Sequence, residues 1–129
     1  TLMDIAPTFY EVAQATYPEK FEGNEIYPLR GNSLMPFVSG KSDQLHSSEY
    51  VFGLEHRGRA MIRKGDWKIT NLKRPFLEDN FKLYNLSQDL AELNDLKEVE
   101  PEKYNELLGE WRKFTEEAGV RIPPPSTEE

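Results

Sequence analysis

The strongest hydrophobic pattern in the chain lies between Pro101 and Gly119. Apolar side chains recur there three or four positions apart, which is the spacing of one face of an α-helix. Pro101 suits the first turn of a helix, and Gly119 suits the residue just beyond its end. The segment therefore predicts an amphipathic helix that packs on a core. Its apolar face consists of Tyr104, Leu107, Leu108, Trp111, Phe114 and Ala118.

A second pattern, RAMIRKGDWKITNL at residues 59–72, predicts a β-hairpin. Two β-rich runs flank Gly65-Asp66, and a two-residue turn at these positions sets the register of the strands. One face of the hairpin is then apolar and the other basic, as in an antiparallel sheet with one wet side. We expect Trp67 on the apolar face and Trp111 of the helix to be core partners. The predicted cross-strand pairs are Lys64 with Trp67, Arg63 with Lys68, and Ile62 with Ile69.

Neighbouring segments extend this hairpin into a sheet of three to four strands. Residues 49–56, EYVFGLEH, have the composition of a strand, and Gly53 indicates a bulge or a close backbone approach. Residues 81–86, FKLYNL, alternate in polarity and predict a further strand. The loop that follows contains leucines that we expect to anchor it on the core, namely Leu90, Leu93 and Leu96.

The first third of the chain is less regular. Residues 4–15 predict a helix with Asp4 as its N-cap and Pro7 in its first turn. Residues 17–48 predict a long irregular connector with a short helical turn at 34–39. A connector of this length is commonly functional or lies along another surface.

These elements predict an α+β fold: a small antiparallel sheet packed against a C-terminal amphipathic helix, with an N-terminal helix and a long irregular loop. Residues 1–122 then form one subdomain. Within it, 1–16 is a junction helix, 17–48 a connecting loop and 49–122 the sheet plus helix. Residues 123–129, PPPSTEE, have nothing to bury and predict a disordered tail.

Composition excludes several classes of function. The chain has 16 Lys and Arg against 23 Asp and Glu, and its net charge of -7 repels nucleic-acid phosphates. No apolar run approaches the roughly 20 residues needed to span a membrane. The sequence contains no cysteine, so it has no disulfide framework, thiolate metal site or thiol nucleophile. We therefore expect no nucleic-acid partner and no membrane span.

Glu55, His56 and Arg57 are the best candidate site in the chain. They place an acid, a titratable base and a guanidinium together at the end of a predicted strand. An ordinary polar turn is the alternative interpretation. His46 and His56 are the only histidines and have no third ligand at regular spacing, so we expect surface or partner contacts and no metal site. From its residues alone, the chain is a structural or binding module.

Five motifs follow one another in an informative order: MDIAPTFYEVA, GNSLMPFVSG, YVFGLEHRGRAMIRKGDWKI, FKLYNLSQDLAELNDL and PEKYNELLGEWRKFTEEAGV. This order resembles the C-terminal part of an arylsulfatase, in the sulfatase family of the alkaline-phosphatase-like superfamily. The resemblance covers nearly the whole chain. It implies a small C-terminal subdomain cut from a longer protein, which agrees with a first residue that is not methionine.

The resemblance implies a parent enzyme that hydrolyses sulfate esters in a large α/β domain. In that family a formylglycine, made from Cys or Ser in a C/S-x-P-x-R motif, attacks sulfur, and a calcium ion stabilises the charge. The chain contains no such motif. We therefore assign it no catalytic residue, metal ligand or cofactor, and expect calcium and formylglycine in the missing N-terminal catalytic domain. That domain and a sulfate ester are the expected partners.

The expected role is to complete a sulfatase that is periplasmic or exported, with this piece inert alone. Glu55, His56 and Arg57, or the loop 17–48, would then shape the rim of the substrate cleft. The alternative is a free-standing module that binds carbohydrate or protein. A large exposed apolar patch favours the piece of a larger protein, because such a patch marks where another domain docks. A homodimer of the piece could also cover it.

Overall fold

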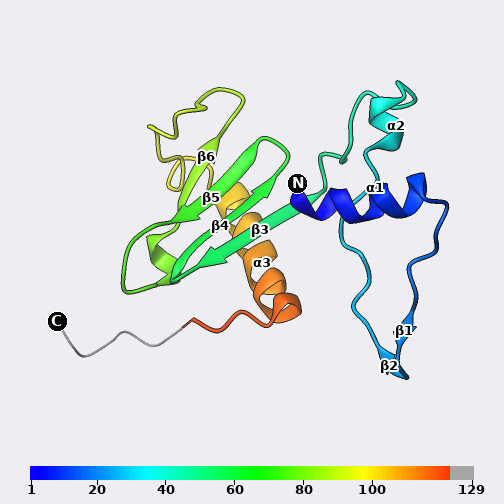
Figure 1. Cartoon of the computed structure of the whole chain (residues 1–129). Helices are drawn as coiled ribbons and strands as arrows, with labels where there is room; N and C mark the ends of the chain where they lie inside the picture. The colour runs from blue at the N-terminus through cyan, green and yellow to red at the C-terminus, as the bar shows by residue number, and fades with distance from the viewer. Residues whose placement is uncertain (123–129) are drawn as a thin grey trace. The chain divides into compact units, whose positions relative to one another are not determined.

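The computed structural model describes residues 1–122, so the predicted tail at 123–129 lies outside the described residues. The chain divides after Ser47 into two compact units, which follow each other along the chain in Figure 1. We call residues 1–47 the N-terminal unit and residues 48–122 the sheet unit. Their helices and antiparallel strands confirm the predicted α+β class.

The N-terminal unit combines short helices with a largely irregular chain. The helix predicted at residues 4–15 is present, and the helical turn predicted at 34–39 is confirmed. A small hairpin was not predicted, because its two-residue strands are exposed and have no hydrophobic alternation. It turns at Glu22 (φ 49°) and Gly23 (φ 82°). The elements are η1 (Leu2–Asp4), α1 (Ile5–Val12), β1 (Lys20–Phe21), β2 (Asn24–Glu25) and α2 (Met35–Val38).

The sheet unit is a four-stranded antiparallel sheet with a helix across one face (Figure 1). Its strands lie side by side in chain order. The register is the predicted one, with Ile62 opposite Ile69 and Lys64 opposite Trp67. Gly65-Asp66 is therefore the two-residue turn that the sequence indicated. The elements are β3 (Val51–His56), β4 (Arg59–Lys64), β5 (Trp67–Asn71), η2 (Glu78–Asn80), β6 (Lys82–Asn85) and α3 (Pro101–Ala118).

The helix α3 begins and ends where the sequence predicts. It starts at Pro101 and is followed by Gly119, whose φ of 61° lies in the left-handed region. The N–H of Val120 then donates to the carbonyl of Thr115 at 2.9 Å and closes the helix end. Within residues 1–122, no helix combines the length and the apolar content that crossing a membrane requires.

The core lies between the inner face of the sheet and α3. At its centre is Trp111, which is 1% exposed. Its indole lies 5.7, 5.4 and 5.8 Å, centroid to centroid, from the rings of Phe76, Phe81 and Phe114. Trp67 is half-buried against the margin of this core, on the predicted apolar face. The buried residues of this core cluster are Ala60, Ile62, Ile69, Phe81, Leu83, Tyr104, Leu107 and Trp111.

The loop after β6 corrects one prediction. Leu96 packs against the core, but Leu90 is 82% exposed and Leu93 79% exposed, so these two do not anchor the loop. Hydrogen bonds hold the loop instead. Asp95 Oδ1 accepts the N–H of Leu83 at 3.1 Å, and the N–H of Leu96 donates to the carbonyl of Leu83 at 2.8 Å. Because backbone and carboxylate contacts fix the loop, its outer leucines need not be buried.

One lysine lies on the inner face, at the edge that the strand ends form around the Gly65-Asp66 turn. Lys64 follows Ile62 by two positions, so its side chain points to the same face. Its Nζ lies 3.0 Å from carboxylate oxygens of both Glu49 and Glu106, and 3.8 Å from one of Glu110. Hydrogen bonds to Glu49 and Glu106 raise the pKa of Lys64 above its ordinary value. The inner face is thus apolar at its centre and ion-paired at this edge.

Two glycines of the sheet unit predict substitutions of opposite sign. A Cβ on Gly53 of β3 would lie 2.6 Å from the ring of Phe114, whereas a Cβ on Gly109 of α3 would meet nothing within 4 Å. We expect Gly53→Ala to lower the free energy of unfolding by about 1–3 kcal/mol, because the ring must move. Gly109→Ala should raise it by about 1 kcal/mol, because alanine favours helix.

Urea unfolding of the 129-residue chain, followed by circular dichroism, measures both effects. A Gly53→Ala variant as stable as the parent chain would show that Phe114 does not pack on β3.

The close approach predicted at Gly53 is an approach of the Phe114 ring, and the pairing of β3 with β4 continues through Gly53 without a bulge.

Candidate functional site

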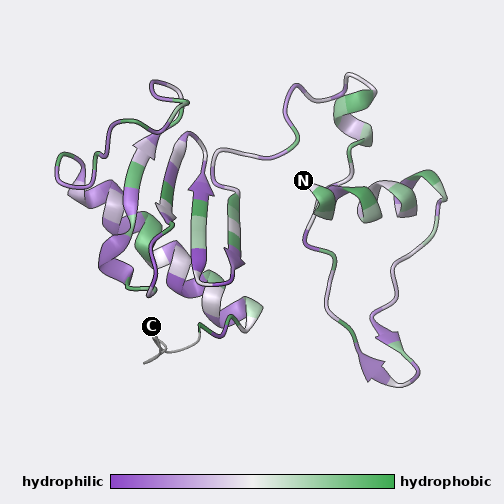
Figure 2. Ribbon diagram, turned by 60° about the vertical axis from the view of Figure 1, so that its left-hand side comes forward, coloured by the Kyte–Doolittle hydropathy of each residue, from purple (hydrophilic) through white to green (hydrophobic). Residues whose placement is uncertain are grey.

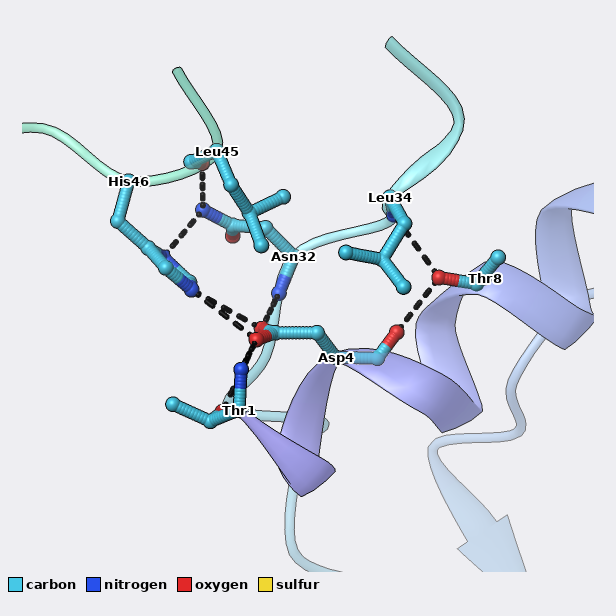
Figure 3. Close-up of polar contacts among 7 residues, drawn as sticks. All are labelled: Thr1, Asp4, Thr8, Asn32, Leu34, Leu45 and His46. Carbon is cyan, nitrogen blue, oxygen red and sulfur yellow. Dashed lines mark hydrogen bonds and ion pairs between the residues drawn. The ribbon is translucent and has the colours of Figure 1, made fainter. Parts of the chain in front are cut away.

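Each unit contains one polar cluster that calls for explanation. In the N-terminal unit, the side chain of Asp4 is fully buried. Figure 3 shows the polar contacts that surround it. The N–H of Asn32 donates to Asp4 Oδ1 at 2.9 Å, and His46 Nε2 lies 3.1 Å from Oδ1 and 3.2 Å from Oδ2. The amino nitrogen and the hydroxyl of Thr1 also contact Oδ2. We call Asp4, Asn32 and His46 the Asp4 cluster.

Asn32 and His46 are linked to each other as well as to Asp4. The Asn32 side-chain amide donates to the carbonyl of Leu45 at 3.3 Å and lies 3.2 Å from His46 Nδ1 (Figure 3). An imidazole that carries its hydrogen on Nε2 satisfies both neighbours, because Nδ1 then accepts from the amide and Nε2 donates to the carboxylate. The cluster is a chain of hydrogen bonds that runs from an amide through an imidazole to a carboxylate.

Opposing effects act on the pKa of Asp4. Burial raises it, whereas hydrogen bonds from the Thr1 amino group, the Asn32 N–H and His46 lower it more strongly. The net result is a pKa far below the ordinary value of 3.8. Asp4 is therefore a carboxylate at neutral pH, and it acts here as a hydrogen-bond acceptor and not as a proton donor.

The contacts around the cluster indicate a structural role for it. Thr8 Oγ1 donates to the Asp4 carbonyl at 2.6 Å and accepts the N–H of Leu34 at 2.8 Å, so its hydroxyl is fully used. A Cβ on Gly31 would lie 2.0 Å from the carbonyl oxygen of Met3, so only glycine allows this approach. Together these contacts fix the segment before α2 against the start of α1. Asp4 occupies the predicted N-cap position of α1, but its side chain is turned to this segment and makes no cap hydrogen bond to the helix.

In the sheet unit, the predicted candidates Glu55, His56 and Arg57 lie at the turn between β3 and β4. Glu55 Oε1 accepts the N–H of Gly58 at 2.7 Å, so this carboxylate closes the turn. Arg57 has a φ of 53° and Gly58 a φ of 75°, as in the primed turns that join twisted strands. His56 is exposed and lies opposite Arg59 on the neighbouring strand.

The arrangement at this turn favours ion binding over proton transfer. The carboxylate of Glu55 is occupied by the backbone, and the guanidinium of Arg57 is exposed. Arg74, which follows β5, donates from Nη2 to the carbonyl of Arg57 at 2.6 Å. The three predicted residues are adjacent, but only His56 and Arg57 offer free side chains to a ligand. Whether they contact a substrate stays a prediction.

The residues of this chain do not fit the calcium ion or the formylglycine that the resemblance implies for the parent enzyme. Among residues 1–122, no group of three or more His, Cys, Asp or Glu side chains is placed to hold a metal ion. The sequence has no cysteine, and no serine stands two positions before a proline. We therefore derive no catalytic step through either group here.

Sequence reasoning missed the Asp4 cluster because its members are far apart in the chain. Asp4 looked like a helix cap, and His46 looked like a surface or partner contact. A partial signal was present in the motif that carries Asn32, GNSL, since a polar residue beside a glycine suits a close backbone approach. Only the fold shows that residues 4, 32 and 46 meet.

Comparison with known proteins gives a relative that aligns with nearly the whole of this chain, although this chain aligns with only a small part of that relative. The chain is 36% identical over 126 residues to an uncharacterized sulfatase of Schizosaccharomyces pombe. The match includes 96% of this chain and 22% of that protein, so the chain spans about a fifth of its relative. No family model matches the chain.

Two solved structures share the fold. The crystal structure of Ps i-CgsB in complex with k-i-k-neocarrahexaose matches at a TM-score of 0.65 and 21% identity, over 87% of this chain and 23% of that one. The structure of BT4656 in complex with its substrate D-glucosamine-2-N,6-O-disulfate matches at 0.61 and 19%, over 98% of this chain and 25% of that one. The predicted resemblance is confirmed: the chain is similar in sequence to part of a sulfatase.

Proposed function

We propose that the chain is the C-terminal part of a sulfatase, where it completes the fold of an enzyme whose remaining part hydrolyses a sulfate ester. The observation that carries this proposal is the alignment of 96% of the chain with only 22% of the yeast sulfatase. Neither polar cluster described above contains a nucleophile beside a base, which supports a role without chemistry of its own. On this proposal the chain alone is inert.

The proposal assigns the formylglycine and the calcium ion to the part of the enzyme outside this chain. It also assigns a substrate class. BT4656 has a disulfated glucosamine as its substrate, and Ps i-CgsB was solved with a neocarrahexaose. We propose a sulfated carbohydrate for this enzyme too, and a periplasmic or exported location.

An exposed apolar face on α1 supports a covalently linked partner domain. Ile5, Phe9 and Val12 follow one another at helical spacing and are 41%, 68% and 61% exposed. Hydrophobic segments recur along α1 in Figure 2. A surface helix of a free-standing domain turns such residues to its own core, so this face is incomplete in the N-terminal unit by itself. We propose that the catalytic part of the enzyme covers it.

This docking predicts a substitution that matters only in the full-length protein. In the 129-residue chain, Phe9→Ser should change the free energy of unfolding by less than about 0.5 kcal/mol, because the ring is exposed. In the full-length enzyme the same change should cost about 2 kcal/mol, because it removes a buried aromatic ring. Thermal unfolding of both proteins measures the difference.

Glu11→Ser is the matched control, since Glu11 lies on the same helix about a third of a turn away from the apolar face. It should have little effect in either protein. Equal stability of the full-length Phe9→Ser and Glu11→Ser variants would refute docking through this face, and would favour a free-standing binding module.

We further propose that Glu55, His56 and Arg57 lie at the rim of the substrate cleft. The exposed side chains of His56 and Arg57 support this, because a guanidinium binds a sulfate group with two parallel hydrogen bonds. Glu55 acts by holding the turn. In the full-length enzyme, His56→Ala should raise KM about 3- to 10-fold for at least one sulfate ester and leave kcat nearly unchanged.

Steady-state assays with nitrocatechol sulfate and with a sulfated disaccharide test the rim proposal. Gln88→Ala, an exposed residue of the loop after β6, serves as the control and should behave as the parent enzyme. Unchanged KM and kcat for His56→Ala on every ester would remove His56 from the rim.

A further inference from the structure

Four cations gather at one end of the sheet. Arg57 lies in the turn between β3 and β4, Arg59 is the first residue of β4, and Lys73 and Arg74 follow shortly after β5. The hydrogen bond of 2.6 Å from Arg74 Nη2 to the Arg57 carbonyl brings the two segments into contact. Figure 1 shows the turn and the exit of β5 at the same end of the sheet. We call Arg57, Arg59, Lys73 and Arg74 the turn cations.

The turn cations differ from most other basic residues of the sheet unit, although Arg63, Lys97 and Arg121 also form no ion pair among residues 1–122. All four are exposed, and within residues 1–122 none of them forms an ion pair with a carboxylate. The nearest acid in the sequence, Glu55, is engaged by the N–H of Gly58. In contrast, ion pairs to carboxylates are formed by Lys64, Lys68, Lys82, Lys103, Arg112 and Lys113.

This concentration of positive charge is notable in a chain whose net charge is -7. Glu55 lies at the same turn, but its carboxylate accepts the N–H of Gly58 and forms no ion pair with these cations. Arg57 also stands at φ 53°, a left-handed position that glycine or asparagine fills more easily. A strained position that carries a free cation points to a function for that cation.

We infer that the turn cations bind the sulfate groups of a sulfated glycan. The inference rests on the proposed function for the identity of the anion, and it adds the residues that hold it. Arginine offers a planar fork that matches the oxygens of a sulfate group, and exposed arginines on two adjacent segments can hold more than one such group. Lys73 adds a flexible point charge beside them.

The surroundings favour a sulfated glycan over a nucleic acid. Strand alternation puts Leu54 and Met61, an opposed pair, on the same face as His56 and Arg59. This face offers apolar surface for a sugar ring beside the cations. The chain's net negative charge repels a long phosphate backbone that extends over its surface. A short anionic segment contacts only the turn cations and avoids this repulsion.

Binding of dextran sulfate to the 129-residue chain tests the inference, with unsulfated dextran and poly(U) RNA of similar length as comparison probes. Affinity electrophoresis at several salt concentrations gives the dissociation constants. We expect the combined variant Arg57→Asn, Arg59→Gln, Arg74→Gln to bind dextran sulfate at least about tenfold more weakly, with a shallower salt dependence. Asparagine suits the backbone at position 57, so this variant keeps the turn.

The matched control removes three cations from α3: Lys103→Gln, Arg112→Gln and Lys113→Gln. It changes the net charge equally and should bind dextran sulfate nearly as the parent chain does. An equal loss in both variants would overturn the inference, as would poly(U) binding as tight as dextran sulfate binding, or no binding at all. Arg59→Gln alone should weaken binding measurably, and its unchanged thermal unfolding excludes a folding defect.

The test separates this inference from the proposed function, because it measures binding to the chain and not turnover. A full-length protein that hydrolyses sulfate esters while the turn cations bind nothing would overturn the inference alone. Selective binding of dextran sulfate by a protein without sulfatase activity would overturn the proposed function and leave these residues as a glycan site.

Discussion

Replacing Trp111 with alanine should lower the free energy of unfolding of the sheet unit by about 3–5 kcal/mol. The indole is 1% exposed and packs on three phenylalanine rings, from the segment before η2, from the residue before β6 and from α3 itself. Removing it leaves a cavity whose aromatic walls come from separate elements and cannot collapse together. A domain of this size has a free energy of unfolding of only about 5–15 kcal/mol, so the variant would lose a large part of its stability.

Trp111→Phe gives a graded comparison and should cost only about 1–2 kcal/mol, because most of the ring volume is kept. Lys113→Ala, two positions along the helix with a side chain 68% exposed, is the surface control and should cost less than about 0.5 kcal/mol. Urea unfolding followed by far-ultraviolet circular dichroism measures all three. A cost below about 1 kcal/mol for Trp111→Ala would contradict the packing described for α3.

Replacing Asp4 with alanine should destabilise the N-terminal unit by about 2–4 kcal/mol. The substitution leaves the Asn32 N–H and His46 without their buried acceptor. Amide hydrogen exchange reports this locally, because the Asn32 and Leu34 N–H groups both donate into the cluster around Asp4 and Thr8. We expect both amides to exchange at least about tenfold faster in Asp4→Ala than in the exposed control Asp43→Ala.

The same carboxylate predicts a dependence on pH. Because its folded-state pKa lies below the ordinary value of 3.8, Asp4 contributes stability that is fully present well above pH 3.8 and is lost as the pH falls toward the folded-state pKa. Protection of the Asn32 amide should therefore weaken below about pH 4 in the parent chain and change less in Asp4→Asn. A parent chain whose Asn32 protection does not respond to acid would contradict the burial of an ionised Asp4.

The sheet unit could be predicted in detail because its determinants are local. The turn at Gly65-Asp66 fixes the register, and strand alternation then fixes which residues face the core. In α3, the helical spacing, Pro101 and Gly119 define both the element and its ends. The exposure of Leu90 was not predictable in this way, because the loop after β6 is held by hydrogen bonds that depend on the folded sheet.

The candidate sites, in contrast to the sheet unit, could be predicted from the sequence only in part. Glu55, His56 and Arg57 were found together because they adjoin in the sequence, but the role of Glu55 in closing the turn depends on strand pairing. The Asp4 cluster joins three distant positions, so no local pattern indicates it. The convergence of Lys73 and Arg74 on the turn likewise requires the return of β5 beside β4.

The central claim is that this chain completes a sulfatase, and hydrolysis of nitrocatechol sulfate by the full-length product of the coding sequence tests it most directly. We predict a C/S-x-P-x-R motif upstream of Thr1, turnover by the full-length protein and no turnover by the 129-residue chain alone. A full-length product without that motif and without turnover of any sulfate ester would contradict the claim and identify the chain as a module of another kind.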